Sequence, residues 1–149
     1  MHNLEKFHII LKQSLREAEK AALKEEIPVG CVILKDGKII ARGHNLRESK
    51  IDPTAHAEII AIRKAAKYLG DWRLNKCELY VTLEPCPLCA WAIIQARIPK
   101  VIFGATDPVY RSRKLLKKHK VEVIPGILEP ACRGILQDFF KKRRTRIRS

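Results

Sequence analysis

Residues 77–89 read CELYVTLEPCPLC, a strand pattern that runs directly into the start of a helix. The first seven residues are rich in β-branched, aromatic and aliphatic side chains, which predicts a strand at 77–83. Pro87 suits the first position of a helix, which we expect to run to about residue 96. Cys86 and Cys89 would then share one face of the helix start, where unpaired amides and the helix dipole favour thiolates.

A second motif, DPTAHAE at residues 52–58, places one histidine and one glutamate near the start of another helix. Asp52-Pro53 or Thr54 marks the end of the preceding loop and the start of the helix, which we expect to continue to about residue 68. Residues two apart do not face each other on a regular helix. Glu58 is therefore a poor co-ligand with His56, but it can reach a water molecule bound to a metal.

Together the two motifs supply one imidazole, two thiols and a spare carboxylate, which suit a zinc ion with an open coordination position. We expect His56, Cys86 and Cys89 to hold the zinc ion and Glu58 to transfer protons. The alternatives are a redox pair of cysteines and a closed structural zinc site. A closed site needs a fourth ligand, and the other cysteines and histidines form no second paired motif. The pattern therefore favours a catalytic metal site.

Strand patterns and helix patterns alternate along the rest of the chain. Apolar residues recur at steps of three and four near the N-terminus, and Lys35-Asp36-Gly37 is a hairpin signal. The expected helices cover residues 4–22, 54–68, 86–96 and 129–142, and the expected strands 29–34, 38–43, 77–83, 100–104 and 121–124. This order predicts an α/β fold, a three-layer α/β/α sandwich around a central mixed five-stranded sheet.

The 149 residues suffice for one domain with a substantial core and are too few for two. We expect a single domain over residues 1–149, with a basic C-terminal helix and tail from about residue 129. No apolar run has membrane-spanning length and no secretory pattern is present, so we expect no membrane partner and a cytoplasmic location. Cys31, Cys77 and Cys132 lie in apolar stretches, as buried free thiols do in reducing compartments.

The formal net charge of +14 is concentrated in two stretches. Residues 111–120 carry six Lys and Arg and no acid, and residues 138–149 carry six against one aspartate. Concentrated positive charge suits a polyanion, because each phosphate contact releases counterions. A solvated basic surface remains the simpler explanation for either stretch alone, and a membrane surface is a weaker third one.

The pairing of H-x-E with P-C-x-x-C is the signature of the zinc-dependent nucleobase deaminases. The chain resembles the bacterial tRNA-specific adenosine deaminases, which have the cytidine-deaminase-like fold. This resemblance extends over nearly the whole chain. The matching stretches are residues 27–30, 44–45, 52–58, 79–86, 103–107 and 138–144.

The resemblance implies a zinc-dependent hydrolase that converts adenosine to inosine at the wobble position (34) of tRNA and releases ammonia. It also implies one zinc ion per subunit, held by His56, Cys86 and Cys89, with Glu58 as the proton shuttle. Family members are homodimers whose active site is bordered by both subunits. The expected partners are therefore a tRNA anticodon stem-loop and a second copy of the chain.

The resemblance further implies contacts between protein and substrate. Asn45 would contact the flipped purine, and Asp107 the neighbouring ribose or backbone, although both residue types are also common in caps and turns. Phosphates of the anticodon stem would be contacted by Lys141, Lys142, Arg143 and Arg144.

The connection between Asp107 and Val121 departs from the family pattern. It is short, contains no glycine and is rich in lysine and arginine, whereas the family usually has a longer connection with glycines. Two other functions stay open. A deaminase of free guanine, cytosine or a small nucleoside needs the same metal site without basic stretches, and a non-catalytic zinc-containing module could bind RNA.

Overall fold

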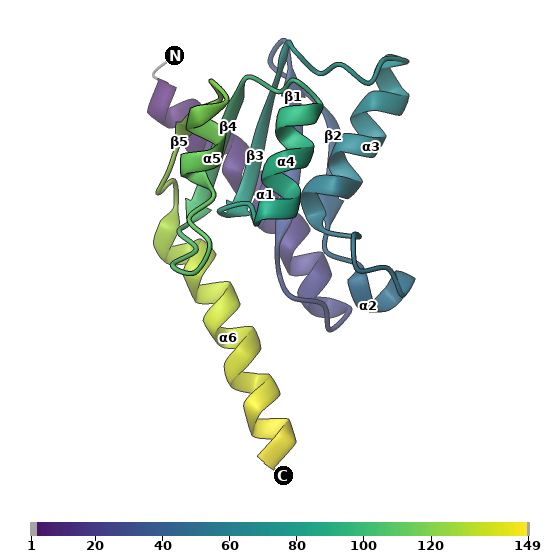
Figure 1. Cartoon of the computed structure of the whole chain (residues 1–149). Coiled ribbons are helices and arrows are strands. Elements are labelled where there is room, and N and C mark those ends of the chain that lie inside the picture. The colour runs from purple at the N-terminus through teal and green to yellow at the C-terminus, as the bar shows by residue number, and fades with distance from the viewer. Residues whose placement is uncertain (1–2, 149) are drawn as a thin grey trace.

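A mixed five-stranded sheet forms the centre of the protein in a computed structural model, which describes residues 3–148 and the side chains up to residue 145 (Figure 1). The strand order is β2-β1-β3-β4-β5. β1 runs antiparallel to β2 and β3, whereas β3, β4 and β5 are parallel. The strands are β1 (Gly30–Lys35), β2 (Lys38–His44), β3 (Cys77–Leu83), β4 (Lys100–Ala105) and β5 (Glu122–Ile124).

Helices cover both faces of this sheet and complete the predicted three layers. α1 (Asn3–Leu23) and α6 (Glu129–Arg148) pack on one face around Tyr80 and Ile102. On the other face, around Phe103, lie α3 (Ala57–Leu69), α4 (Pro87–Gln95) and α5 (Arg113–Lys118). α1 approaches the sheet so closely that a Cβ on Gly30 would lie 1.9 Å from the Ser14 carbonyl oxygen. Glycine is therefore required at this crossing.

The helices differ from the sequence prediction at three places. α5 and the four-residue α2 (Arg47–Lys50) lie in segments expected to be loops, because such short helices show too few turns for periodicity to be recognised. α6 continues to Arg148 rather than ending near residue 142, since lysine and arginine are good helix formers. Among residues 3–148, no helix is long and apolar enough to cross a membrane.

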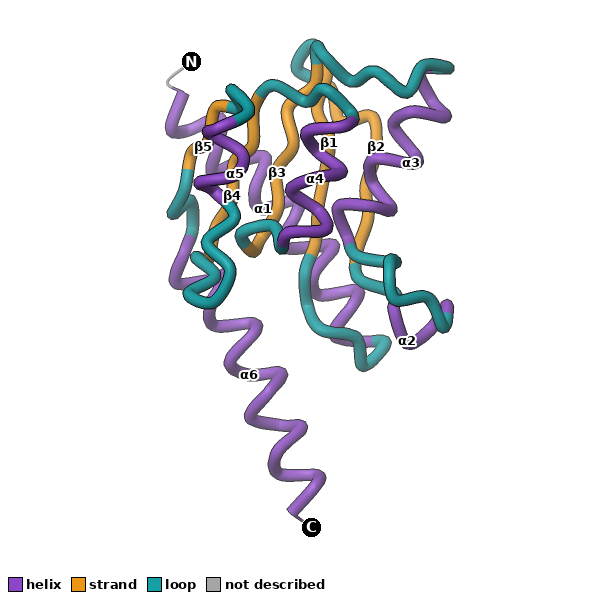
Figure 2. Tube along the Cα trace, in the orientation of Figure 1, coloured by secondary structure: helices purple, strands orange, loops and turns teal. Residues whose placement is uncertain are grey.

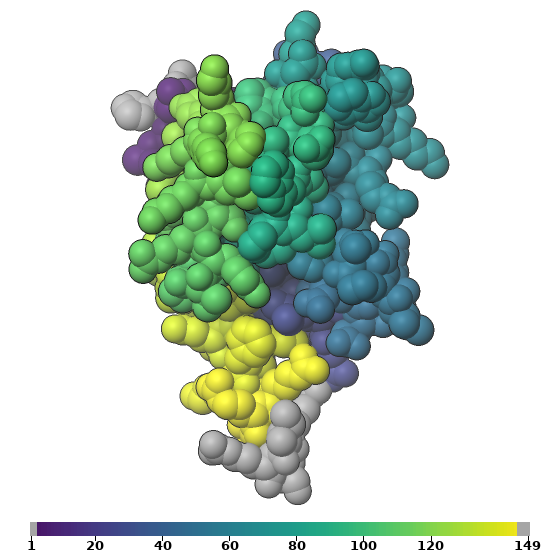
Figure 3. Space-filling view, in the orientation of Figure 1, coloured from purple at the N-terminus to yellow at the C-terminus, as the bar shows by residue number. Residues whose placement is uncertain are grey.

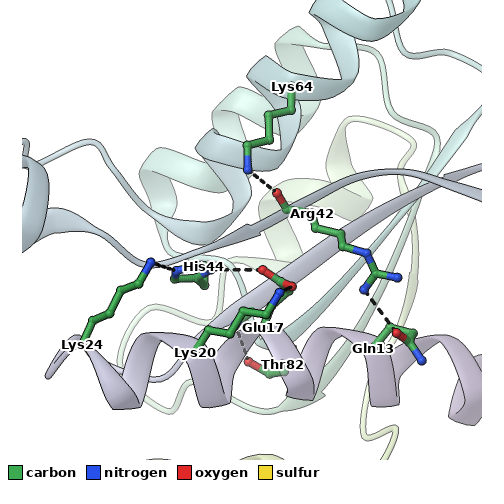
Figure 4. A network of polar contacts seen from close by, with 9 residues as sticks. Gln13, Glu17, Lys20, Lys24, Arg42, His44, Lys64 and Thr82 are labelled. Atoms are coloured by element: carbon green, nitrogen blue, oxygen red, sulfur yellow. Dashed lines mark hydrogen bonds and ion pairs between the residues drawn. The ribbon is translucent and has the colours of Figure 1, made fainter.

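A polar network fastens α1 to the end of β2 (Figure 4). Glu17 is buried and accepts hydrogen bonds from His44 Nδ1 at 3.0 Å and Lys20 Nζ at 2.7 Å. Lys24 Nζ lies 2.9 Å from His44 Nε2. Because the lysine ammonium can only donate, Nε2 is assigned as the acceptor and Nδ1 as the protonated nitrogen. The network fixes the chain immediately before Asn45.

The carboxyl ends of β3 and β4 lie side by side at one edge of the sheet. Leu83 pairs with Ala105, and the Glu84 amide donates to the Ala105 carbonyl at 2.8 Å. Loops gather at the same edge (Figure 2). Sites in open α/β sheets form where such loops and helix starts meet, and both predicted motifs begin here.

Candidate metal centre and active site

The predicted metal ligands meet in one cluster. His56 Nδ1 lies 3.5 Å from Cys86 Sγ and 3.5 Å from Cys89 Sγ. All three ligand atoms lie within 4.8 Å of one another. Zinc–nitrogen and zinc–sulfur bonds of about 2.0 and 2.3 Å in a tetrahedron separate the two ligand atoms by roughly 3.5 Å. The donor set and its spacing therefore fit a zinc ion.

Two helix starts position these ligands. His56 is the N-cap of α3 and Cys86 the N-cap of α4, both with extended backbone, and Pro87 occupies the predicted first helical position. The segment before α3 is held by Asp52, whose Oδ1 accepts from the Thr54 amide and hydroxyl at 2.9 and 2.8 Å. The positive ends of both helix dipoles favour the thiolate ligands.

The pKa values of the two thiols in the cluster are shifted in opposite directions. The hydrogen bond from Cys89, together with that from His56, lowers the pKa of Cys86 to about 4. The hydrogen bond with Cys86 raises the pKa of Cys89 well above its ordinary value, as does burial. The Cys86 hydrogen bond raises the pKa of His56. Cys86 is therefore already a thiolate at neutral pH and ready to bind a cation.

Glu58 lies in the same site but not in the ligand cluster. Its residue surface is only 4% exposed, and burial raises its pKa to about 7. A carboxyl group with a pKa near the operating pH can both accept and deliver protons. Glu58 is not one of the three residues whose ligand atoms form the cluster, and its role as a proton shuttle stays a prediction.

A small pocket of about 130 Å³ lies next to the metal cluster and Glu58. Asn45, His56, Glu58, Cys86 and Asp107 all contribute to its wall. This volume is well below the roughly 300–1,000 Å³ of pockets for drug-sized ligands. The pocket therefore suits a single planar base rather than a whole nucleotide.

Asn45 and Asp107 each also have a local structural role. Asn45 Nδ2 donates to the Ile27 carbonyl at 3.4 Å, and its Oδ1 accepts from the Arg47 amide at 3.4 Å. Asp107 Oδ1 accepts from the Val109 amide at 2.9 Å, which makes the turn after β4. Both side chains are thus held in place at the pocket wall.

Sequence reasoning missed a buried ion pair behind the pocket. The Glu84 side chain is fully buried, and its Oε2 accepts from Arg113 Nε at 3.1 Å while Oε1 accepts from the Asp107 amide at 2.9 Å. Arg113 Nη2 also donates to Thr106 Oγ1 at 2.9 Å. The position of Glu84 directly before Pro85-Cys86 is a signal of its importance. Arg113 stands in the basic stretch 111–120, where the sequence alone does not indicate its partner.

The four basic residues predicted to bind RNA all lie on exposed α6, away from the metal cluster. Lys142 and Arg143 line a groove of about 690 Å³ between α6, the end of α1 and α2. In Figure 3 the surface of α6, in yellow, lies directly below the green and blue body of the molecule. The groove contains none of the predicted metal ligands, so any role it has concerns binding rather than chemistry.

The chain is similar in sequence and architecture to known deaminases. The chain matches the MafB19-like deaminase family over residues 5–144. It is 45% identical, over 144 aligned residues, to the tRNA-specific adenosine deaminase of Bacillus subtilis (strain 168), with 91% of this chain and 89% of that protein covered.

Solved structures agree with the sequence comparison. A structure from a study of A-to-I editing by tRNA:A34 deaminases at the wobble position superimposes with a TM-score of 0.81 and 40% identity, covering 85% of this chain and 97% of that one. A guanine deaminase from Bacillus subtilis superimposes with a TM-score of 0.64 and 45% identity, covering 71% and 66%. The predicted cytidine-deaminase-like fold is confirmed.

Proposed function

Because the chain belongs to the MafB19-like deaminase family, and within it to the tRNA-specific adenosine deaminases, we propose that it converts adenosine to inosine at position 34 of tRNA. The observation that carries this proposal is the meeting of His56, Cys86 and Cys89 beside the buried Glu58 in a base-sized pocket. Water replaces the 6-amino group of adenine, and ammonia leaves.

We propose zinc as the resident metal, one ion per subunit. His56, Cys86 and Cys89 would hold it, and two thiolates with one neutral imidazole balance its charge. When bound, zinc lowers the pKa of water from about 15.7 toward about 7 and so supplies a nucleophile at neutral pH. The N···S separations of 3.5 Å support this assignment.

Glu58 carries the proton transfers in this proposal. It takes a proton from the attacking water and delivers one to the ring nitrogen beside the target carbon. It then passes the remaining proton of that water oxygen to the departing amine, so that the C–N bond breaks as the carbonyl of inosine forms. A pKa of about 7 for Glu58 suits both directions of transfer at neutral pH.

Asn45 and Asp107 would position the substrate. The Asn45 amide would bind the flipped purine, and the Asp107 carboxylate would bind the adjoining ribose or backbone. Their places in the pocket wall, and the hydrogen bonds that restrict both, support these roles.

The RNA partner proposed is the anticodon stem-loop, contacted through Lys141, Lys142, Arg143 and Arg144. All four side chains are exposed on α6. We place the protein in the cytoplasm, where tRNA is found and where the three buried thiols outside the metal cluster stay reduced.

A second subunit is also proposed. α4 exposes Leu88 and Trp91, which are 43% and 45% accessible, and its N-cap residue Cys86 belongs to the metal cluster. A second copy packed on this helix would cover the apolar surface and border the pocket, as expected for a homodimer.

Deamination of a free base is the second candidate, because the pocket has the size of a single base and the guanine deaminase structure is similar.

One experiment distinguishes the two candidates. Zinc-loaded protein is incubated with tRNA, with its isolated anticodon stem-loop and with free guanine, cytosine and adenosine. Sequencing should find A read as G at position 34, with ammonia released in step. Ammonia from a free base, with tRNA unchanged, would establish the second candidate instead.

A further inference from the structure

Arg47 brings a positive charge to the pocket that contains the metal cluster. It is the only lysine or arginine among the described residues of the pocket wall. Its side chain is exposed, and none of the ion pairs found among the described residues includes it. Three acids share this wall, and none of them forms an ion pair with Arg47: Glu84 is paired with Arg113, Glu58 is buried, and Asp107 Oδ1 accepts from the Val109 amide. Arg47 is therefore available to an anion at the pocket mouth.

The backbone of Arg47 is held from both sides. Its amide donates to Asn45 Oδ1 at 3.4 Å, and its carbonyl accepts from the Asp52 amide at 3.0 Å. The preceding Leu46 amide donates to the Ala55 carbonyl at 2.9 Å, next to the ligand His56. The first residue of α2 is thus tied to the segment that carries the metal-binding histidine.

A buried carboxylate fixes the rest of α2. Glu26 is 1% exposed, and its Oε2 accepts from the Ser49 amide at 2.7 Å and the Ser49 hydroxyl at 2.6 Å. Its Oε1 accepts from the Glu48 amide at 3.1 Å. Burial of a carboxylate is costly unless it is fully hydrogen-bonded, and here the bonds all go to one short helix. Glu26 therefore determines where α2, and with it Arg47, lies.

We propose that Arg47 binds a phosphate group next to the nucleotide whose base enters the pocket, and that Glu26 is the residue that positions it. This inference rests on the proposed function, since an RNA substrate brings its backbone to the pocket mouth when one base is extruded. The ribose joins that base to a phosphate, so the phosphate stays at the rim. The planar guanidinium can bind two phosphate oxygens at once.

The test measures binding of the anticodon stem-loop to the zinc-loaded protein by fluorescence anisotropy. All variants are made in a Glu58→Ala background, so that the RNA is not turned over. The variants are Arg47→Gln, Glu26→Gln and both together. Lys50→Gln is the matched control, because Lys50 is exposed on the same helix but does not line the pocket. Ser49→Ala removes only the hydrogen bond from the Ser49 hydroxyl to Glu26, and it replaces Glu26→Gln in the test if that variant does not fold.

Arg47→Gln should weaken RNA binding about tenfold, as expected for the loss of a charge-assisted contact. It should also reduce the slope of log affinity against log salt by about 0.7. Lys50→Gln should change affinity by less than about twofold. Equal losses in the two variants would overturn the proposal, because Arg47 would then contribute only net charge.

Glu26→Gln and Ser49→Ala should also weaken RNA binding, and neither should weaken it further once Arg47→Gln is present. Additive losses would show that Glu26 does not act through Arg47. Inosine formation by the unmutated protein, and by Lys50→Gln made separately with Glu58 intact, tests the proposed function. Absence of inosine with a normal Arg47 effect on binding would reject the deamination of tRNA and leave the phosphate contact standing.

Discussion

Glu58 lies beside the ligand cluster without belonging to it, so its removal should separate chemistry from metal binding. Glu58→Ala should retain its zinc and lose at least about 100-fold in inosine formation, the scale of general acid–base catalysis. Zinc content by mass spectrometry and inosine by nuclease digestion and chromatography give the two readouts. Glu19→Ala, at an exposed position on α1, is the control. Loss of zinc together with activity would instead make Glu58 a metal ligand.

The Glu84–Arg113 pair should be important for stability, because Glu84 is fully buried and Arg113 is its cationic partner. Arg113→Leu keeps the apolar bulk near Phe103 and leaves the carboxylate without its countercharge. We expect a loss of about 3 kcal/mol in the free energy of unfolding, measured in urea. Arg73→Leu breaks the exposed pair with Asp71 and should leave stability unchanged. Similar effects of the two substitutions would contradict this account.

The functional residues that can be predicted from the sequence stand in short motifs, whereas those that cannot be predicted have partners far away in the sequence. His56, Cys86, Cys89 and Glu58 stand in two short motifs whose residue types already indicate metal chemistry. Glu84 and Arg113 are separated by 29 residues in the sequence, and they come into contact only in the folded protein, where β3 and β4 lie side by side. Glu26 is likewise 22 residues from the amide it caps. Such contacts between residues far apart in the sequence cannot be predicted from a short sequence motif.

At the scale of elements, the network around Glu17 joins α1 to β2 and should give the protein an acid-sensitive connection. Burial raises the pKa of Glu17, but hydrogen bonds from Lys20 and His44 outweigh it and leave the pKa below its ordinary value of 4.5. A lowered carboxyl pKa stabilises the native state above the unfolded pKa, and this stability is lost as pH falls through the folded pKa.

Glu17→Gln should therefore be less stable than the unmutated protein at pH 7 by about 2 kcal/mol, since hydrogen bonds to a charged acceptor are lost. The difference should shrink progressively as pH falls below about 4.5, the ordinary pKa, and through the lower pKa of the native carboxylate. Urea unfolding at a series of pH values measures it, with Glu19→Gln on the same helix as the control. A difference that stays constant with pH would show that Glu17 acts only through packing.

Long elements with a clear period were predicted well. The strand at residues 77–83 and the helix start at Pro87 agree with the structure. α2 and α5 were not predicted, because four and six residues complete fewer than two turns. α2 additionally depends on hydrogen bonds from Glu26, outside its own segment. The sequence predicts an end of α6 near residue 142, earlier than Arg148, because a run of lysine and arginine is also typical of a solvated tail.

For the whole molecule, the basic end of α6 should dominate the salt dependence of RNA binding. Changing Lys141, Lys142, Arg143 and Arg144 to glutamine should lower the slope of log affinity against log salt by about 3, at roughly 0.7–0.9 per lost phosphate contact. The control changes four exposed cations near the opposite ends of β3 and β4, namely Lys67, Arg73, Lys76 and Arg97. An equal effect of the control set would mean that only net charge matters.

Assembly is the second property of the whole molecule that can be tested. Trp91→Glu places a charge on the exposed apolar side of α4 and should convert a dimer to a monomer with reduced activity. Trp72→Glu alters an equally exposed tryptophan, 53% accessible, that stacks against Arg73 and Arg97 instead. Light scattering should find the Trp72 variant at twice the mass of one chain. A Trp91 variant of that same mass would exclude α4 as the interface.

The length of α6 has a consequence for which molecules the protein can distinguish. Its 20 residues span about 30 Å, and its basic end projects away from the sheet edge where the pocket opens (Figure 1). A mononucleotide seated in the pocket is too short to reach that end, whereas a folded hairpin can touch both at once. With α6 binding RNA as proposed, progressive shortening of the RNA should reduce occupancy of the pocket, while a base that has entered the pocket should react at an unchanged rate.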